Sequence, residues 1–425
     1  MQMTNSLKPI KMKVGINTRI AYTYMVSKVK STLVAALGVT FGIGMFIFMN
    51  SLITGTNDYS EKTMLSATPH IRLYNDNKIS NTDMLNRYEG NKTINLISNP
   101  QLVPQDNRIF NPDAVAAVLR RRKEVIALST QVTANIIYSK GNVQENGTIF
   151  GVNIAEQDKM FDISSNMIAG KTQSVADNPN NILIGIGLAQ KLNLKMGDYV
   201  RITTSNGLTK TLQVSGIFKT TIKNVDETKT YVSLPVVQQL LQKDRAYITD
   251  IYVNVKNYSR ATETGNSMAQ QTGYTSESWQ QSNEQSLAGK KIRDIIANAV
   301  IFTILLVAGF GIYNILNMVI YEKIKEIAIL KATGFQGSDV VSIFIQQALL
   351  IGLLGSAMGL VVGWLTSYLL SKLYLGIGNV TYLPMTFLSK HYIQGAIFGI
   401  LTSFFAGYIP ARKASKVDPV SIIRG

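Results

Sequence analysis

The sequence predicts an α-helical membrane protein with four transmembrane helices and a large mixed α/β extracytoplasmic domain between the first and second helix. Two observations predict this fold class: the distribution of charge-free apolar runs, and the long segment of mixed polarity between the first two runs. The runs cover residues 31–57, 295–321, 340–371 and 392–411 of the 425-residue chain. Each run reaches the roughly 20 residues needed to cross a hydrocarbon core about 30 Å thick. The segment between the first two is long enough to bury a core of its own.

Lysine and arginine predict the orientation of these helices. Six basic residues and no acidic residue precede the first run, namely Lys8, Lys11, Lys13, Arg19, Lys28 and Lys30. The tail carries Arg412, Lys413, Lys416 and Arg424 against Asp418. Because basic flanks stay on the cytoplasmic side, we expect both termini in the cytoplasm of a bacterium and the large domain in the periplasm. The first run is longer than the roughly 7–15-residue core of a signal peptide, so we expect an uncleaved anchor in the inner membrane.

These expectations divide the chain into nine segments. They are a cytoplasmic N-terminal segment (1–32), the first span (33–56), the periplasmic domain with its stalk (57–291), the second span (292–321), a cytoplasmic coupling helix (322–339), the third span (340–371), a short periplasmic loop (372–391), the fourth span (392–411) and a cytoplasmic tail (412–425).

Composition excludes several kinds of chemistry. The chain has no cysteine and only two histidines, His70 and His391. A thiolate metal site is therefore excluded, and neither a histidine zinc site nor a Ser-His-Asp triad is expected. The net charge of +16 comes without the basic and aromatic pattern of a nucleic-acid site, and its basic flanks favour contact with the anionic lipid bilayer. We expect no catalytic, cofactor-binding or metal-binding residue in this chain.

The outward segment has the alternation of strands and short helices that is typical of an α/β domain. Residues 68–74 alternate like a strand. Asn111-Pro112-Asp113 offers an N-cap, a proline at the first helical position and an acidic first turn, so we expect a helix that runs to about Ala127. Further strands are expected near 126–137, 147–152, 212–218, 231–234 and 250–255, with strand, helix, turn and strand over 181–202 and a helix from 235 to about 243.

A stalk is expected where the outward domain meets the second span. Trp279, Leu287 and Ile292 are spaced so that they could form the apolar side of one helix that continues into that span. An unbroken helix is stiff along its axis, so it would transmit motion.

The segment between the second and third spans predicts a short amphipathic helix. Ile324, Ile327 and Ala328 fall on one side, charged residues occupy much of the rest, and Gly334 follows as a C-cap. No G-x-x-x-x-G-K-[ST] phosphate-binding loop occurs anywhere in the chain. The helix is therefore either a docking element for a separate motor protein or an ordinary interfacial loop helix.

Glycines recur every four residues within three of the spans. They are Gly38 and Gly42 in the first span, Gly355, Gly359 and Gly363 in the third, and Gly395 and Gly399 in the fourth. Small residues at this spacing allow helix backbones to approach closely in lipid. A single pair is ordinary background in membrane helices, but three such series predict packed helices within or between chains.

The four apolar runs at 31–57, 295–321, 340–371 and 392–411 contain no aspartate, glutamate, lysine or arginine. Ion-coupled transporters need buried ionisable groups, so this absence argues against secondary transport and channel functions. A substrate path through these spans would be apolar and would suit a lipid-like or lipidated cargo.

Several segments resemble the permease subunits of type VII ABC transporters, the superfamily of the macrolide-exporter, lipoprotein-releasing and FtsX permeases. They are YEKIKEIAILKATGF at 321–335, IGLLGSAMGLVVGW at 351–364, IPARKASKVDPVSIIRG at 409–425 and ILIGIGLAQKLNLKMGDYVRI at 182–202. Residues 68–74, Trp279 and LLVAGFGIYNILNMVIYEK at 305–323 look most like the lipoprotein-releasing branch. The first span is equally similar to an exporter permease.

The resemblance implies a complex that is driven by ATP hydrolysis in a partner subunit. Two permease copies, identical or paralogous, would pair with two cytoplasmic ABC ATPases that bind ATP and magnesium, while this chain binds no cofactor. The residues expected to dock in the ATPase groove are Glu322, Lys325, Glu326 and Lys331, with Gly334 at the end of the helix and Arg412 nearby. ATPase closure would move the second span and stalk, a mechanism called mechanotransmission.

Three cargo hypotheses follow from the resemblance. The first is release of lipoproteins to a periplasmic carrier. The second is efflux of drugs or peptides through a periplasmic adaptor and an outer-membrane duct. The third is FtsX-like signalling to a cell-wall hydrolase, for which a domain of this size is large.

Overall fold

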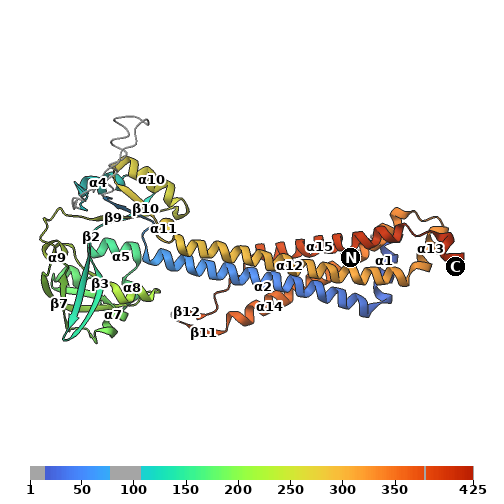
Figure 1. Ribbon diagram of the computed structural model, residues 1–425, viewed down its shortest axis with the longest axis horizontal. Coiled ribbons are helices and arrows are strands. Elements are labelled where there is room, and N and C mark those ends of the chain that lie inside the picture. The colour runs from blue at the N-terminus through green and yellow to red at the C-terminus, as the bar shows by residue number, and fades with distance from the viewer. Residues whose placement is uncertain (1–14, 77–106, 378–379, 425) are drawn as a thin grey trace, which may run out of the picture. The chain divides into compact units, whose positions relative to one another are not determined.

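The structure, a computed structural model, describes residues 15–76, 107–377 and 380–424 (Figure 1). It forms two compact units, which we call the helical unit (1–59 and 289–425) and the α/β unit (60–288). Lys8, Lys11, Lys13 and the side chain of Arg424, four of the charges that orient the chain, lie outside the described residues.

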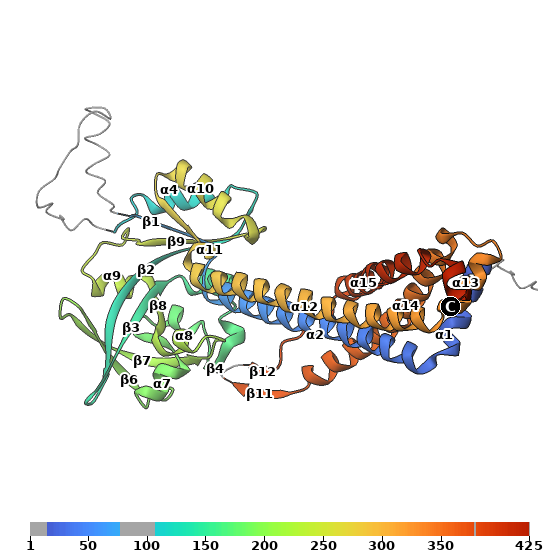
Figure 2. The same cartoon turned by 45° about the vertical axis from the view of Figure 1, so that its right-hand side comes forward.

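Among its described residues, the helical unit has four helices that are long and apolar enough to cross a membrane: α2, α12, α14 and α15. This agrees with the sequence prediction. Both views show α2 beside α12 (Figures 1 and 2). The bounds are α1 Ile16–Ser27, α2 Val29–Ala67, α12 Glu284–Glu322, α13 Ile324–Ala332, α14 Gly337–Ser371, α15 Ser389–Ser415 and α16 Pro419–Arg424, with a β11 Tyr374–Ile377 and β12 Val380–Tyr382 hairpin between α14 and α15.

The first spanning helix continues well beyond the apolar run. Helix α2 ends at Ala67, whereas the sequence prediction ended the span at residue 56. Polar residues such as Asp58 and Glu61 lie within this extension. Loss of hydropathy marks where an apolar run ends, but it does not end a helix whose backbone hydrogen bonds continue.

In the described part of the α/β unit, ten strands form one sheet in the order β10-β1-β9-β2-β3-β8-β5-β7-β4, with β6 paired to β2 and β7. The β3–β8 and β5–β7 pairs are parallel. The strands are β1 Ile71–Tyr74, β2 Val125–Lys140, β3 Val143–Val152, β4 Met167–Gly170, β5 Asn181–Gly185, β6 Tyr199–Thr204, β7 Thr209–Phe218, β8 Lys229–Ser233, β9 Asp250–Val255 and β10 Thr275–Ser278. The helices are α4 Pro112–Arg120, α5 Ile154–Phe161, α6 Ser174–Asp177, α7 Ile186–Lys191, α8 Lys223–Thr228, α9 Leu234–Leu240, α10 Ala261–Thr272 and α11 Trp279–Ser282.

The long strand β2 organises this sheet because it pairs with three others. Its first half pairs with β9 and its second half with β3 and β6. Val132, Ile136 and Tyr138 point from β2 into the core, and each is at most 3% exposed. Between Asn135 and Tyr138 exposed and buried residues alternate, which is typical of a strand, whereas adjacent residues are both buried in the first half of β2.

Two expectations about α4 were wrong. The helix ends at Arg120, and β2 already begins at Val125, so the helix does not reach Ala127. Asn111 precedes Pro112 as predicted, but its side chain makes no capping hydrogen bond. Asn111 instead has a φ of 49°, in the left-handed region that asparagine tolerates better than most residues.

The expected apolar side of the stalk was also wrong. Trp279 belongs to the separate helix α11, and α12 begins only at Glu284. Trp279 is 4% exposed and donates its indole N–H to the carbonyl of Tyr258 at 2.8 Å, so it belongs to the core of the α/β unit. Leu287 packs against that same core, while Ile292 is 58% exposed. The continuous helix from Glu284 to Glu322 is nevertheless present.

Candidate functional site

The segment between α12 and α14 forms a helix held between two sharp breaks. Lys323 interrupts the helical backbone after Glu322, and α13 then runs from Ile324 to Ala332. Gly334 follows with a φ of 106°, a conformation that favours glycine, so the chain reverses there. A capping box between Gln336 and Asp339 starts α14. Local chemistry therefore defines both ends of α13.

One side of α13 is built into the core of the helical unit. Ile327 and Ala328 are at most 1% exposed, as their helical spacing predicts, and Ile324 is half-buried. Ile327 belongs to a cluster that draws on α1, α12, α14 and α15: Ala21, Tyr24, Val319, Ile320, Ile327, Val340, Ile343, Phe344, Ala411 and Ala414. Close-packed side chains transmit displacement rather than absorb it. A force on α13 therefore reaches the ends of three spanning helices.

Charged contacts fix the neighbouring helix α1 to this segment. Lys28 pairs with Glu322 at 2.9 Å, and Lys323 pairs with Glu326. The Lys323 ammonium also lies 5.3 Å from the centroid of the Tyr24 ring. Burial, with the nearby Glu326 carboxylate, raises the pKa of Tyr24 to about 12, so its hydroxyl stays protonated at neutral pH.

Lys331 has a different environment from the one expected for a docking residue. Its ammonium donates to the carbonyl oxygens of Ser415 at 3.0 Å and Val417 at 2.6 Å. It therefore caps the end of α15 and ties it to α13. This contact could not be predicted from the sequence, because Lys331 and Ser415 are 84 residues apart.

The remaining predicted docking residues are on the surface. Glu322, Lys325 and Glu326 are exposed, and Arg412 is exposed in the last turn of α15. Ile329, which was not predicted from the sequence as a docking residue, is 56% exposed beside them. We call Glu322, Lys325, Glu326 and Ile329 the coupling surface. The sequence feature that could have predicted its exposure is the position of this isoleucine on the charged side of a short helix.

A concavity of about 370 Å³ adjoins the coupling surface. Residues of α1 and α13 line it: Arg19, Ile20, Thr23, Tyr24, Glu326, Ile329 and Leu330. It offers apolar walls together with one cationic and one anionic side chain. Such a surface fits a protein partner better than a small neutral molecule.

The glycine series lie where spanning helices approach closely. A Cβ placed on Gly355 would lie 2.6 Å from the Cβ of Val39, and one on Gly359 would lie 2.8 Å from the Cβ of Ile43. Side chains of α2 similarly crowd Gly363, Gly395 and Gly399, while Ala308 of α12 lies 3.1 Å from the corresponding position of Gly42. Gly38 faces open space and takes no part in packing within the described chain.

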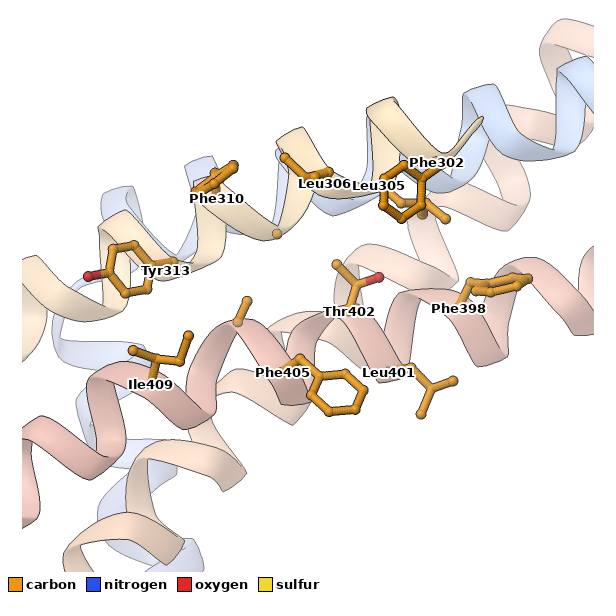
Figure 3. Close-up of a pocket in the computed structure, with 12 residues that line it drawn as sticks. Phe302, Leu305, Leu306, Phe310, Tyr313, Phe398, Leu401, Thr402, Phe405 and Ile409 are labelled. Atoms are coloured by element: carbon orange, nitrogen blue, oxygen red, sulfur yellow. The ribbon is translucent and has the colours of Figure 1, made fainter. Parts of the chain in front are cut away.

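An apolar groove lies between α12 and α15 (Figure 3). Its volume is about 490 Å³, within the range of about 300–1,000 Å³ typical of ligand pockets. The lining residues are Phe302, Leu305, Leu306, Gly309, Phe310, Tyr313, Phe398, Leu401, Thr402, Phe405, Ala406 and Ile409. None of these side chains is charged, so the groove suits hydrocarbon and excludes ions.

No group of three or more histidine, aspartate or glutamate side chains that could hold a metal ion occurs in the part of the chain that the structure describes. The two histidines have local partners instead. His70 Nδ1 lies 3.0 Å from the backbone of Val255, and His391 Nε2 lies 3.3 Å from the hydroxyl of Thr54.

Two protein families match most of the chain. Residues 32–271 match the MacB-like periplasmic core domain, and residues 298–419 match the FtsX-like permease C-terminal domain. The first match covers most of α2 and most of the α/β unit, and the second covers most of α12 through α15.

Individual relatives agree with these families. The lipoprotein-releasing system transmembrane protein LolC of Neisseria meningitidis is 23% identical, over 92% of this chain and 94% of its own length. An uncharacterized ABC transporter permease of Methanocaldococcus jannaschii is 29% identical over 57% of this chain and 62% of its own length. The macrolide export ATP-binding/permease protein MacB of Escherichia coli is 33% identical over 28% of this chain and 17% of its own length.

Among solved structures, the periplasmic region of MacB from Actinobacillus actinomycetemcomitans is similar to 51% of this chain, with a TM-score of 0.32 and 12% identity.

Proposed function

Because this chain belongs to the ABC transporter permeases that join a MacB-like periplasmic core domain to an FtsX-like C-terminal domain, we propose that it releases lipoproteins from the inner membrane. The energy comes from a separate cytoplasmic ATPase that docks on the coupling surface. The lipoprotein passes to a periplasmic carrier, and a second permease copy or a paralogue completes the membrane part of the complex.

The packing of α13 is the observation that supports drive by a separate ATPase, which this proposal requires. The exposed side of α13 presents charged residues and Ile329. On the buried side, Ile327 packs in a cluster with the ends of α12, α14 and α15. An ATPase that moves α13 must therefore move these helices. Because α12 is continuous from Glu284 to Glu322, such a movement passes along one stiff element.

The apolar groove supports a lipidated cargo. An acyl chain in the outer leaflet could enter it sideways from the bilayer, since α12 and α15 present only uncharged side chains there. Full-length similarity to a lipoprotein-releasing permease points in the same direction.

Efflux of drugs or peptides is the second candidate function. The short segment shared with the macrolide exporter has the higher identity, 33%, although it covers only 28% of this chain. An apolar groove also suits a hydrophobic drug. FtsX-like signalling to a cell-wall hydrolase is the third candidate.

Depletion of the protein followed by membrane fractionation separates these functions. We expect lipoproteins to accumulate in the inner membrane, because no other step would extract their acyl chains. Normal lipoprotein sorting together with drug hypersensitivity would replace our proposal with efflux. Division or chaining defects alone would indicate signalling.

A further inference from the structure

Lys229 is a buried cation in the α/β unit with no anionic partner. It is the first residue of β8 and is only 8% exposed. It makes no ion pair and no hydrogen bond from its side chain within the described residues. Buried lysines are rare unless paired, so this position requires an explanation.

Three aromatic rings surround the Lys229 ammonium. Its Nζ lies 4.5 Å from the ring centroid of Phe150, 5.1 Å from that of Phe161 and 5.2 Å from that of Tyr231. Ring faces attract a cation but not a neutral amine. Burial lowers the pKa of Lys229 to about 8, so the ammonium form still predominates at neutral pH. The site therefore holds a positive charge that no protein carboxylate neutralises.

Lys229 lines a small cavity that also has polar walls. The cavity measures about 50 Å³, which exceeds the roughly 10–15 Å³ that one water needs. The hydroxyl groups of Ser66 and Thr221, 3.3 Å from each other, form part of its wall together with Asn166. Asp226 makes no ion pair with Lys229 among the described residues. Its carboxylate accepts hydrogen bonds from the backbone N–H and the hydroxyl of Thr220.

We propose that this cavity binds one small monovalent anion, of the size of chloride or formate, with the Lys229 ammonium as its counter-ion and the Thr221 hydroxyl as a second donor. Phe161 and Tyr231 line the cavity together with Lys229. Their rings stabilise the cation, and the anion neutralises its charge. A cavity of this size excludes larger anions. The site is distinct from the coupling surface and the groove, and it does not depend on the proposed transport function.

Ser66 connects this site to the long helix α2, because it lies in the last turn of that helix. An anion that bridges Lys229 and Thr221 would also lie against this turn. Binding would therefore fix the end of α2 onto the sheet at β8.

The test is the thermal unfolding of the full-length protein in detergent at pH 7, with chloride replaced by gluconate at constant ionic strength. The chain has two tryptophans, so a Trp364→Phe background leaves the buried Trp279 to report on the α/β unit. We expect chloride to raise the midpoint by a few degrees in a saturable way, because it binds only the folded state. Lys229→Met should abolish the chloride response.

Lys243→Met is the matched control. Lys243 is exposed, and its ammonium lies 5.0 Å from the ring centroid of Tyr247, so this variant removes a lysine over a ring without touching the cavity. It should keep the full chloride response. Crystals of the protein soaked in bromide should show an anomalous peak beside Lys229. The proposal would be overturned if chloride left the unfolding midpoint unchanged, or if the chloride shift persisted in Lys229→Met. It would also be overturned if the cavity contained only water.

Discussion

At the residue scale, the glycines of α14 mark where two spanning helices touch. Gly355 and Gly359 face the β-branched side chains of Val39 and Ile43 on α2, so backbone and side chain meet without a gap. In lipid there is little hydrophobic force between helices, and such close packing supplies the attraction instead. The stability of the helical unit therefore depends on the absence of side chains at Gly355 and Gly359.

The glycine contacts make a direct prediction. Gly355→Leu should destabilise the protein by roughly 1–3 kcal/mol, because the new side chain must displace Val39. Gly38→Leu is the control, since Gly38 faces open space in this chain. Thermal unfolding in detergent should show a clear loss for the first variant and little change for the second. Equal losses would show that this helix pair is packed differently.

Lys229 makes a prediction about pH. Burial lowers the pKa of Lys229 in the folded state to about 8, from its ordinary value near 10.5. The folded protein therefore releases this proton first, and its stability should rise as the pH increases from about 8 towards 10. The gain is roughly 2–3 kcal/mol when the anion is replaced by gluconate. Unfolding by denaturant across this range checks it, and Lys229→Met should show no such rise.

The opposite trend begins at higher pH. Burial raises the pKa of Tyr138 and Tyr252 above the ordinary value near 10, so unfolded tyrosines ionise first and stability falls there. A wild-type protein whose stability already falls between pH 8 and 9 would contradict the environment described for Lys229.

The sequence could predict the close glycines but not the lysine. Spacing by four places Gly355, Gly359 and Gly363 on one helix face, and only the identity of the facing helix was missing. Lys229 carries no such signal, because its burial depends on Phe150 and Phe161 from other elements. The contact between Lys331 and the end of α15 could not be predicted for the same reason, because its carbonyl partners lie 84 and 86 residues away in sequence. The docking role of Lys331 stays a prediction.

At the element scale, continuity of helices is the main feature. Helix α12 contains 39 residues, about 1.5 Å of length for each, and no proline interrupts it. Hydropathy located all four spanning helices, because an apolar run of this length has few other uses in a protein. It could not locate their ends, and α2 continues to Ala67 through polar residues.

Stiffness of α12 can be tested by interrupting it. A Gly-Gly-Ser insertion after Lys290 should abolish cargo release while ATP hydrolysis by the assembled complex continues, because each helical glycine costs about 1 kcal/mol and the stiff connection is lost. The same insertion after Gly141, in the turn between β2 and β3, is the control and should leave release intact. Normal release with the Lys290 insertion would exclude α12 as the transmitting element.

At the scale of the whole molecule, this permease has a surface on which an ATPase could dock, and its sequence contains no phosphate-binding loop of the G-x-x-x-x-G-K-[ST] type. One side of α13 carries the exposed, mostly charged coupling surface. The opposite side packs into the core of the helical unit. The sequence predicted this helix and its buried residues Ile327 and Ala328. The involvement of α1, through Lys28 and Tyr24, could not be predicted because it depends on how distant helix ends meet.

The central claim is that a separate ATPase drives this chain through the coupling surface. The most direct measurement compares ATP hydrolysis by the purified chain alone, by the ATPase that copurifies with it, and by their complex. We predict no turnover by the chain alone, and stimulation of the ATPase that Glu326→Lys removes while the permease stays folded, because the ion pair with Lys323 that this variant loses is half-exposed and contributes less than about 1 kcal/mol. Appreciable hydrolysis by the chain alone, or full stimulation by the Glu326→Lys variant, would contradict the account.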